Sequence, residues 1–128
     1  MNTQQRTTKN IKRDILKEKM DELAYSVYKE TKSFPKDEIF GITSQLRRAV
    51  LSIVLNYIEG YARNGAKEYR NFLKISYGSL QETKYLLFFS ARENYLSEGS
   101  YAKLEKLTDE VGALLWTTLE RIKDSIGK

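Results

Sequence analysis

The sequence predicts an all-α protein, an antiparallel up-down-up-down four-helix bundle, and three observations lead to it. Apolar residues recur at steps of three and four along four stretches, which is the helical period, and no stretch alternates as a β-strand would. The 128 residues include only seven Gly and one Pro, so few residues interrupt the predicted helices. The breaks between the stretches are short, and short connections between long helices place consecutive helices antiparallel.

The first predicted helix covers residues 10–32. Its apolar stripe advances by four, three and four residues, through Leu16, Met20, Leu23 and Val27. Pro35 stops the helix, because the residue before a proline is disfavoured in the α conformation. Residues 1–9 are polar and lack an apolar period, so we expect a flexible basic tail there. The bundle is expected to occupy residues 10–128.

The second and third helices are predicted at residues 42–63 and 67–96. The second stripe consists of Ile42, Leu46, Val50, Ile53, Tyr57 and Tyr61, and the third of Tyr69, Phe72, Ser76, Leu80, Thr83 and Leu87. Asn64 and Gly65 separate the two helices, since Gly and Asn favour the backbone conformation that ends a helix.

The fourth helix is predicted at residues 101–126, after a turn at residues 97–100 that contains Gly99. Its stripe comprises Leu104, Leu107, Val111, Leu114, Thr118 and Ile122.

Two segments carry more apolar residues than one buried stripe needs. Between residues 49 and 58 only Ser52 and Asn56 interrupt the apolar run, and residues 85–89 are aromatic or aliphatic throughout. A thick core is one explanation. A second apolar face left in water is the other, and such a face marks a protein interface. We expect self-association.

The composition argues against catalysis. The chain has no Cys and no His, which removes thiolate chemistry, the usual general base near pH 7 and the commonest metal ligand. A di-iron bundle would need Glu-x-x-His pairs. We therefore expect no catalytic residue, no metal and no cofactor, and a protein that is not an enzyme. No run of about 18–20 apolar residues could span a membrane and no secretion signal is visible, so a cytoplasmic location is expected.

Three segments carry a specific resemblance. They are residues 34–49 (FPKDEIFGITSQLRRA), the set Ser52-Ile53, Asn56, Glu59-Gly60-Tyr61 and Arg63, and the set Gly78-Ser79-Leu80 with Glu82-Thr83. Together they resemble the "four helix bundle protein" family, which is encoded in intervening sequences of bacterial large-subunit ribosomal RNA genes and was formerly described as S23 ribosomal protein.

The resemblance implies a four-helix bundle that assembles as a ring-like homopentamer. It also implies distant kinship with the accessory variability proteins of diversity-generating retroelements, which are basic pentamers that bind nucleic acid and a reverse transcriptase. The family usually has a proline after the Ser-Ile pair, whereas this chain has Val54. A proline inside a helix kinks it, so the second helix is expected to be straighter here.

Basic residues are the candidates for nucleic-acid binding. The net charge is +5, and residues 1–32 hold eight Lys/Arg against five Asp/Glu. Arg6, Lys9, Lys12 and Arg13 would form a patch that an oligomer repeats around its axis, although a solvated tail is the simpler interpretation. Arg47 and Arg48 would bind phosphate or pair with Glu59 or Glu82.

Further polar and aromatic residues have proposed structural roles. Asn56, Glu59 and Arg63 share a helical face and, with Glu82, are expected to form a buried polar network that fixes helix register, with ligand binding as the alternative. Gly60 and Gly78 lie inside helices, where a close approach would offset their cost. Most of the nine tyrosines are expected to pack in the core or an interface, and Tyr95 and Tyr101 are the candidates for exposure.

The sequence thus leads to a non-enzymatic oligomer that binds RNA or another nucleic acid through repeated basic surfaces. The alternative is a protein-binding scaffold that recruits an enzyme acting on nucleic acid.

Overall fold

Four α-helices and one short 3-10 turn make up residues 3–126, the part of the chain that the computed structural model describes; side chains are described for residues 15–124. The helices are α1 (Thr3–Thr31), α2 (Ile42–Ala62), α3 (Ala66–Arg92) and α4 (Glu98–Ile126), and the turn η1 (Lys36–Glu38) precedes α2. Within these residues there is no strand, which confirms the predicted all-α four-helix bundle.

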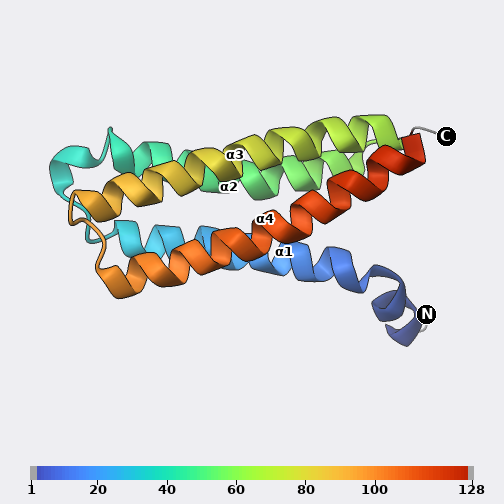
Figure 1. Cartoon of the computed structure of the whole chain (residues 1–128), viewed down its shortest axis with the longest axis horizontal. Helices are drawn as coiled ribbons and strands as arrows, with labels where there is room; N and C mark the ends of the chain where they lie inside the picture. The colour runs from blue at the N-terminus through green and yellow to red at the C-terminus, as the bar shows by residue number, and fades with distance from the viewer. Residues whose placement is uncertain (1–2, 127–128) are drawn as a thin grey trace.

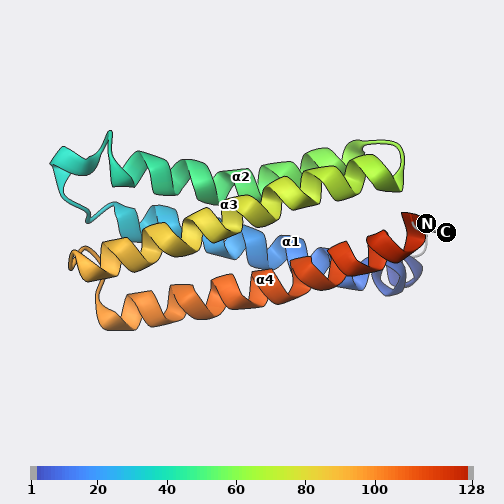
Figure 2. The ribbon, with the colours of Figure 1, turned by 45° about the horizontal axis from the view of Figure 1, so that its top comes forward.

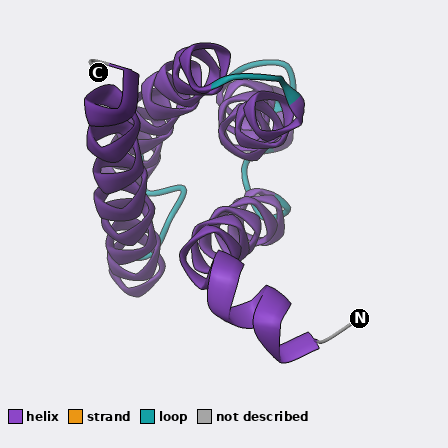
Figure 3. Ribbon diagram, turned by 90° about the vertical axis from the view of Figure 1, so that its right-hand side faces the viewer, coloured by secondary structure: helices purple, strands orange, loops and turns teal. Residues whose placement is uncertain are grey.

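Each helix begins at the end of the molecule where the preceding helix finishes (Figures 1 and 2). Helix α1 contacts α2 and α4, and α3 also contacts α2 and α4, so α1 lies diagonally across from α3. The view along the bundle shows the resulting four-cornered arrangement (Figure 3). The α2–α3 turn therefore lies at the same end of the bundle as the beginning of α1 and the end of α4.

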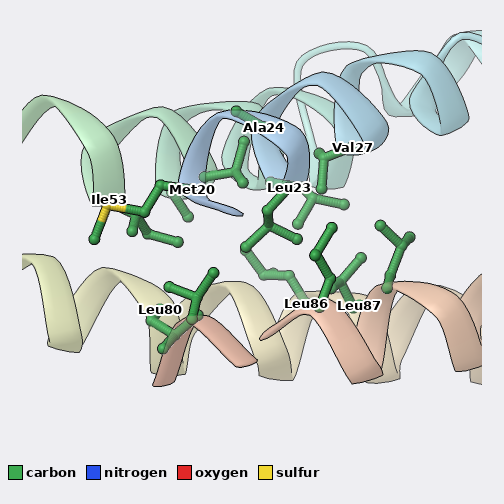
Figure 4. Packing of buried hydrophobic residues seen from close by; sticks show 14 of the residues in the cluster. Met20, Leu23, Ala24, Val27, Ile53, Leu80, Leu86 and Leu87 are labelled. Atoms are coloured by element: carbon green, nitrogen blue, oxygen red, sulfur yellow. The ribbon is translucent and has the colours of Figure 1, made fainter. Parts of the chain in front are cut away.

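The core is formed by the predicted stripes. The whole α1 stripe from Leu16 to Val27 is buried, and Ile53, Leu80 and Leu87 from α2 and α3 pack against it (Figure 4). Small residues let α2 and α3 approach closely. Ser76 donates a hydrogen bond to the carbonyl oxygen of Ile53 at 2.7 Å, so this buried hydroxyl is satisfied across the helix pair.

The predicted stripes of α2, α3 and α4 need corrections. On α3 the predicted Tyr69 and Phe72 are only half-buried, and Leu73 is the fully buried residue of these turns. On α4 the fully buried residues after Val111 are Leu115 and Leu119, while the predicted Leu114 and Thr118 are only half-buried. Steps that alternate between three and four residues average 3.5, slightly less than a helical turn, so such a stripe gradually rotates around a straight helix. Steps of four from Val111 to Leu115 and from Leu115 to Leu119 correct this rotation and keep both leucines facing the core. On α2 the stripe ends at Tyr57 and Gly60, and Tyr61 is exposed.

The helices end near the predicted helix-breaking residues, except at the connection between α3 and α4. Pro35 leads into η1, and Gly65 precedes α3 with a φ of 104°, a conformation that strains any residue with a Cβ. The predicted turn at residues 97–100 is wrong: α3 ends at Arg92, and Asn94 with a φ of 63° makes the reversal. Asn tolerates this left-handed conformation better than other non-glycine residues.

The first helix starts earlier than predicted. Residues 1–9 were expected to be a tail, but α1 is already helical at Thr3, and residues 1 and 2 lie outside the described part. Residues 3–9 contain no Gly or Pro, and Gln, Arg and Lys are good helix formers, so nothing local stops the helix. Its first turns bend away from the other helices (Figures 1 and 3).

The second apolar face is present. Leu55 is 57% exposed on α2, and Tyr85 and Phe88 are exposed on α3. Phe40, just before α2, is 93% exposed. These apolar side chains do not contribute to the buried core of a single protomer. None of the helices in the described part has the length and apolar character needed to cross a bilayer.

Candidate nucleic-acid interface

One end of the bundle holds the excess positive charge, and we call it the basic end. It comprises residues 3–14, 59–74 and 116–126, which are the beginning of α1, the α2–α3 turn with its flanking turns, and the end of α4. By sequence these segments carry ten Lys/Arg and five Asp/Glu, or +5. The rest of the described chain carries eleven Lys/Arg and twelve Asp/Glu, or −1. The positive charge is thus concentrated at one end.

Three tyrosines form a cluster at the basic end. Tyr57 and Tyr61 come from α2 and Tyr69 from α3, and their ring centroids are separated by 6.2–6.4 Å. Tyr61 and Tyr69 meet edge to face at 86°. Tyr57 is buried and Tyr69 half-buried, while Tyr61 is 50% exposed. The cluster is anchored in the core and reaches solvent at Tyr61.

Gly60 makes this cluster possible. A Cβ placed on Gly60 would lie 2.8 Å from the Cβ of Phe72 and 3.2 Å from Tyr69 Cδ1, closer than side chains pack. The predicted close approach at Gly60 is therefore found, between α2 and α3. A Cβ on Gly78 would meet nothing within 4 Å, so the same prediction is wrong for Gly78 within the protomer, because that position faces outward on α3.

A pocket of about 550 Å³ opens beside the tyrosines. Its lining consists of Gly60, Tyr61, Arg63, Gly65, Ala66, Tyr69, Arg121 and Ile122. It joins the end of α2, the start of α3 and the last turns of α4.

The two arginines of the pocket differ in their interactions with other side chains. Arg63 donates hydrogen bonds to Glu59 Oε1 at 3.1 Å from Nε and 2.6 Å from Nη2, and its guanidinium lies 5.1 Å from the ring centroid of Phe72. Arg121 is exposed and has no ion pair within the described side chains. Arg121 is therefore the cation of this pocket that is available to an anion.

The predicted N-terminal patch belongs to the same end. The side chains of Arg6, Lys9, Lys12 and Arg13 lie outside the described residues. Their backbone forms the first turns of α1, which start at the basic end (Figures 1 and 2).

Arg47 and Arg48 separate as expected of adjacent helical residues. Arg47 is half-buried, donates a hydrogen bond from Nε to Thr31 Oγ1 at 2.8 Å, and lies 4.7 Å over the ring of Tyr28. It joins α2 to α1 through a hydroxyl and a ring rather than through the carboxylate of Glu59 or Glu82. Glu59 lies about three turns further along α2 and pairs with Arg63. Arg48 is exposed beside the α2–α3 groove, away from the basic end.

The predicted buried network does not form as one unit. Asn56 donates hydrogen bonds to the carbonyl and hydroxyl oxygens of Ser52, and the hydroxyls of Ser52 and Ser79 lie 2.7 Å apart. Glu59, Arg63 and Glu82 are exposed, so the prediction that they are buried is wrong. Glu59 and Arg63 at the end of α2 and Glu82 on α3 are in contact with solvent, which keeps their charges hydrated.

The predicted exposure of Tyr95 and Tyr101 is wrong. Tyr95 is half-buried, packs on Phe34 at 5.4 Å, and donates a hydrogen bond to Glu38 Oε2 at 2.9 Å, which raises the pKa of Tyr95. Burial, with a hydrogen bond to Glu105, raises the pKa of Tyr101. Tyr95 covers the connection before α2 because the chain turns earlier than predicted, and Tyr101 packs against the core.

Several residues of the basic end were missed from the sequence. Lys67, Lys74, Arg121 and Lys123 lie in separate segments, none of which is strongly basic alone. Counting charges by bundle end would have found them, because the predicted helix order already places these segments together. Among the described residues no group of three acidic side chains is placed to hold a metal ion.

Comparison with known proteins identifies the family. A crystal structure from the S23 ribosomal protein family of Bacteroides thetaiotaomicron, a protein of unknown function, superposes with a TM-score of 0.79 at 24% sequence identity. The match covers 85% of this chain and 98% of that one, and it establishes likeness of fold. No curated protein matches the sequence. The sequence pattern of the 23S rRNA-intervening sequence proteins matches residues 12–117. This chain belongs to the 23S rRNA-intervening sequence protein family.

Proposed function

We propose that this protein is a non-enzymatic homo-oligomer that binds RNA through the basic ends of its protomers. The observation that carries the proposal is the separation of charge, +5 at the basic end and −1 over the rest of the described chain. A one-sided cluster of Lys and Arg is the electrostatic footprint of nucleic-acid binding. The family is named for intervening sequences of 23S rRNA, which supports RNA as the ligand. The absence of Cys and His supports a non-enzymatic role, and the cytoplasmic location belongs to the same proposal.

Self-association is the second part of the proposal, and we propose a homopentamer. The family resemblance suggests the number of subunits, and Phe40 and Leu55 offer apolar surface for contacts between copies. Assembly would present several basic ends together, so weak phosphate contacts would add up by multivalency. Light scattering should give about five times 14.9 kDa. A monomer at tens of micromolar would exclude this part of the proposal.

Salt dependence tests the RNA-binding part. If a pentamer engages about five phosphates of a single strand, log K should fall by about three to four units per tenfold rise in salt. The measurement is fluorescence anisotropy of a labelled single-stranded RNA at several salt concentrations. No binding at about 50 mM salt, or tight binding independent of salt, would reject RNA binding through phosphate contacts.

Matched charge variants locate the surface. Lys67, Lys74 and Lys123 are exposed at the basic end, and Lys32, Lys36 and Lys103 are exposed elsewhere. Changing the first three to Gln should weaken binding to all RNA sequences alike and flatten the salt slope, because phosphate contacts carry no base information. The second triple variant removes the same charge and should bind almost as the wild type does.

The N-terminal patch is tested separately. Changing Arg6, Lys9, Lys12 and Arg13 to Gln should also flatten the salt slope, since these residues follow the backbone of α1 at the basic end. Binding that is unchanged in this variant and in the first triple variant would show that RNA uses another surface.

A protein-binding scaffold that recruits a nucleic-acid-processing enzyme is the second candidate function. The exposed side chain of Phe40 favours it, because an apolar ring at a loop tip suits a protein partner as well as a second copy. A stoichiometric protein complex that survives nuclease treatment and is lost in Phe40→Asp would support this candidate. Loss of the pentamer in the same variant would instead assign Phe40 to self-association.

A further inference from the structure

The pocket at the basic end combines an exposed aromatic ring, two glycines and an exposed arginine. We propose that it takes one unpaired base of single-stranded RNA, stacked on Tyr61, with the neighbouring phosphate bound by Arg121. This inference rests on the proposed RNA-binding function and specifies the form of RNA that the basic end selects.

The floor of the pocket is made of backbone and small residues. Gly60, Gly65 and Ala66 line it, so little side-chain volume fills the space between Tyr61 and Arg121. A Cβ on Gly65 would meet nothing within 4 Å, which shows that the turn side of the pocket is open. Its volume of about 550 Å³ lies within the range of about 300–1,000 Å³ that small ligands occupy. A base with its ribose fits such a space.

The ring of Tyr61 is both held and accessible. It contacts Tyr57 at 6.4 Å and Tyr69 at 6.2 Å, so two neighbours restrict its orientation. Half of its side chain is exposed, at the rim of the pocket. A ring that is already fixed loses little conformational entropy when a base stacks on it. Stacking on aromatic side chains is how proteins bind single strands without sequence preference.

The charge beside the ring favours a nucleotide over an apolar group. Arg63 is engaged by Glu59 and Phe72, whereas Arg121 lines the pocket without an ion pair among the described side chains. A phosphate next to a stacked base would meet Arg121 and the surrounding positive charge of the basic end. In a duplex the bases are stacked on one another, so the pocket should select single strands.

Base stacking can be measured independently of charge. The probe is a single-stranded RNA of about 12 nucleotides with 2-aminopurine at its centre, because stacking quenches the fluorescence of this base. The same probe annealed to its complement is the duplex control. The variants are Tyr61→Ala, Tyr61→Phe and Arg121→Gln. Tyr25→Ala is the matched control, since Tyr25 is 74% exposed and lies on α1 outside the basic end.

The wild type should quench the single-stranded probe and bind the duplex more weakly. Tyr61→Ala should lose the quenching and about 5- to 100-fold in affinity, the range found when a stacking ring is removed. Tyr61→Phe should keep both, and Tyr25→Ala should behave as the wild type. Arg121→Gln should reduce the salt slope by about 0.7 for each phosphate that Arg121 binds in the wild type, while quenching remains. Circular dichroism confirms that each variant is folded.

Two results would overturn the inference and separate it from the proposed function. If Tyr61→Ala binds and quenches as Tyr25→Ala does while the basic-end lysine variants still weaken binding, the protein binds RNA but this pocket takes no base. If duplex and single strand bind equally and neither is quenched, binding uses the phosphate backbone alone. Absence of any RNA binding rejects the inference and the proposed function together.

Discussion

The two ends of the bundle use the same kinds of residue for opposite purposes. At the end opposite the basic end, Tyr95 packs on Phe34 and donates a hydrogen bond to Glu38, and Ser100 donates one to Glu30 at 3.1 Å. These contacts join the region before α2 to the region where α4 begins. At this end, tyrosine and carboxylate side chains hold the connections between helices in contact with one another.

At the basic end the connection between α2 and α3 is short. The α2–α3 turn is only Arg63 to Gly65, and the helices are brought together by the missing side chain of Gly60. Tyr61 and Arg121 line the pocket beside this turn. The two ends differ in that side chains connect the loops at one end, whereas a close approach of two helix backbones forms the connection at the other.

The largest effect is expected from breaking the core that both ends share. Leu87 is 1% exposed in the middle of the bundle, and an unpaired charge at such a site costs at least about 3 kcal/mol. Leu87→Asp should therefore unfold or strongly destabilise the protein. Lys103→Asp, on the exposed face of α4, should change the free energy of unfolding by at most about 0.5 kcal/mol. Urea denaturation followed by circular dichroism compares them, and equal midpoints would refute the assigned core face.

The next effect concerns how the basic end is closed. Gly60→Ala places a methyl group 2.8 Å from the Cβ of Phe72, so α3 must shift, at a cost of about 1–3 kcal/mol. Gly78→Ala is the matched control, because its Cβ enters open space and alanine favours a helix by about 1 kcal/mol. The first variant should be less stable than the wild type and the second more stable. Near-ultraviolet circular dichroism should change for Gly60→Ala as the tyrosine cluster moves.

Two adjacent arginines sharpen the comparison further. Arg47 bridges to Thr31 and Tyr28, so Arg47→Gln should lose about 1–2 kcal/mol of stability. Arg48 is exposed, so Arg48→Gln should stay within about 0.5 kcal/mol of the wild type. Neither residue belongs to the basic end. A loss of RNA affinity in Arg48→Gln as large as that in Lys67→Gln would show that binding extends along α2.

The sequence alone predicted the helices well because their evidence is local. The stripe from Leu16 to Val27 and the breaker Gly65 are readable within a few residues. The tyrosines were harder to place, because Tyr61 and Tyr95 both lie at helix ends, where one residue of shift decides exposure. The early turn at Asn94 places Tyr95, which was expected to be exposed, in contact with Phe34.

Only some residues of the candidate site could be predicted from the sequence. The N-terminal basic residues were visible as a cluster in sequence, but Lys67 and Arg121 join them only in space. The pocket depends on Gly60 lying against Phe72, a contact between helices that no local pattern specifies. Basic residues that are far apart in the sequence but close in the folded bundle are not found by counting charges along the chain.

The smallest effect is expected at a partly exposed ion pair between the ends. Lys19 of α1 and Glu110 of α4 lie 2.7 Å apart, and the hydrogen bond between them raises the pKa of Lys19 and lowers the pKa of Glu110. Because the pKa of Glu110 is lower in the folded state, its contribution is present above its ordinary value of 4.5 and is lost as the pH falls through the folded value. Because the pKa of Lys19 is raised, its contribution is complete below 10.5 and is lost above the folded value.

The pair should therefore stabilise the α1–α4 contact across the neutral range and fail in acid. Glu110→Gln should lower the Tm slightly at pH 7, and the difference from the wild type should shrink as the pH falls below 4.5. Glu120→Gln, an exposed change on the same helix, should show no such dependence on pH. Added salt should shrink the effect at pH 7, because exposed charges are screened. A difference that does not shrink as the pH is lowered below 4.5 would mean that Glu110 acts through packing, and that the α1–α4 contact does not depend on charge.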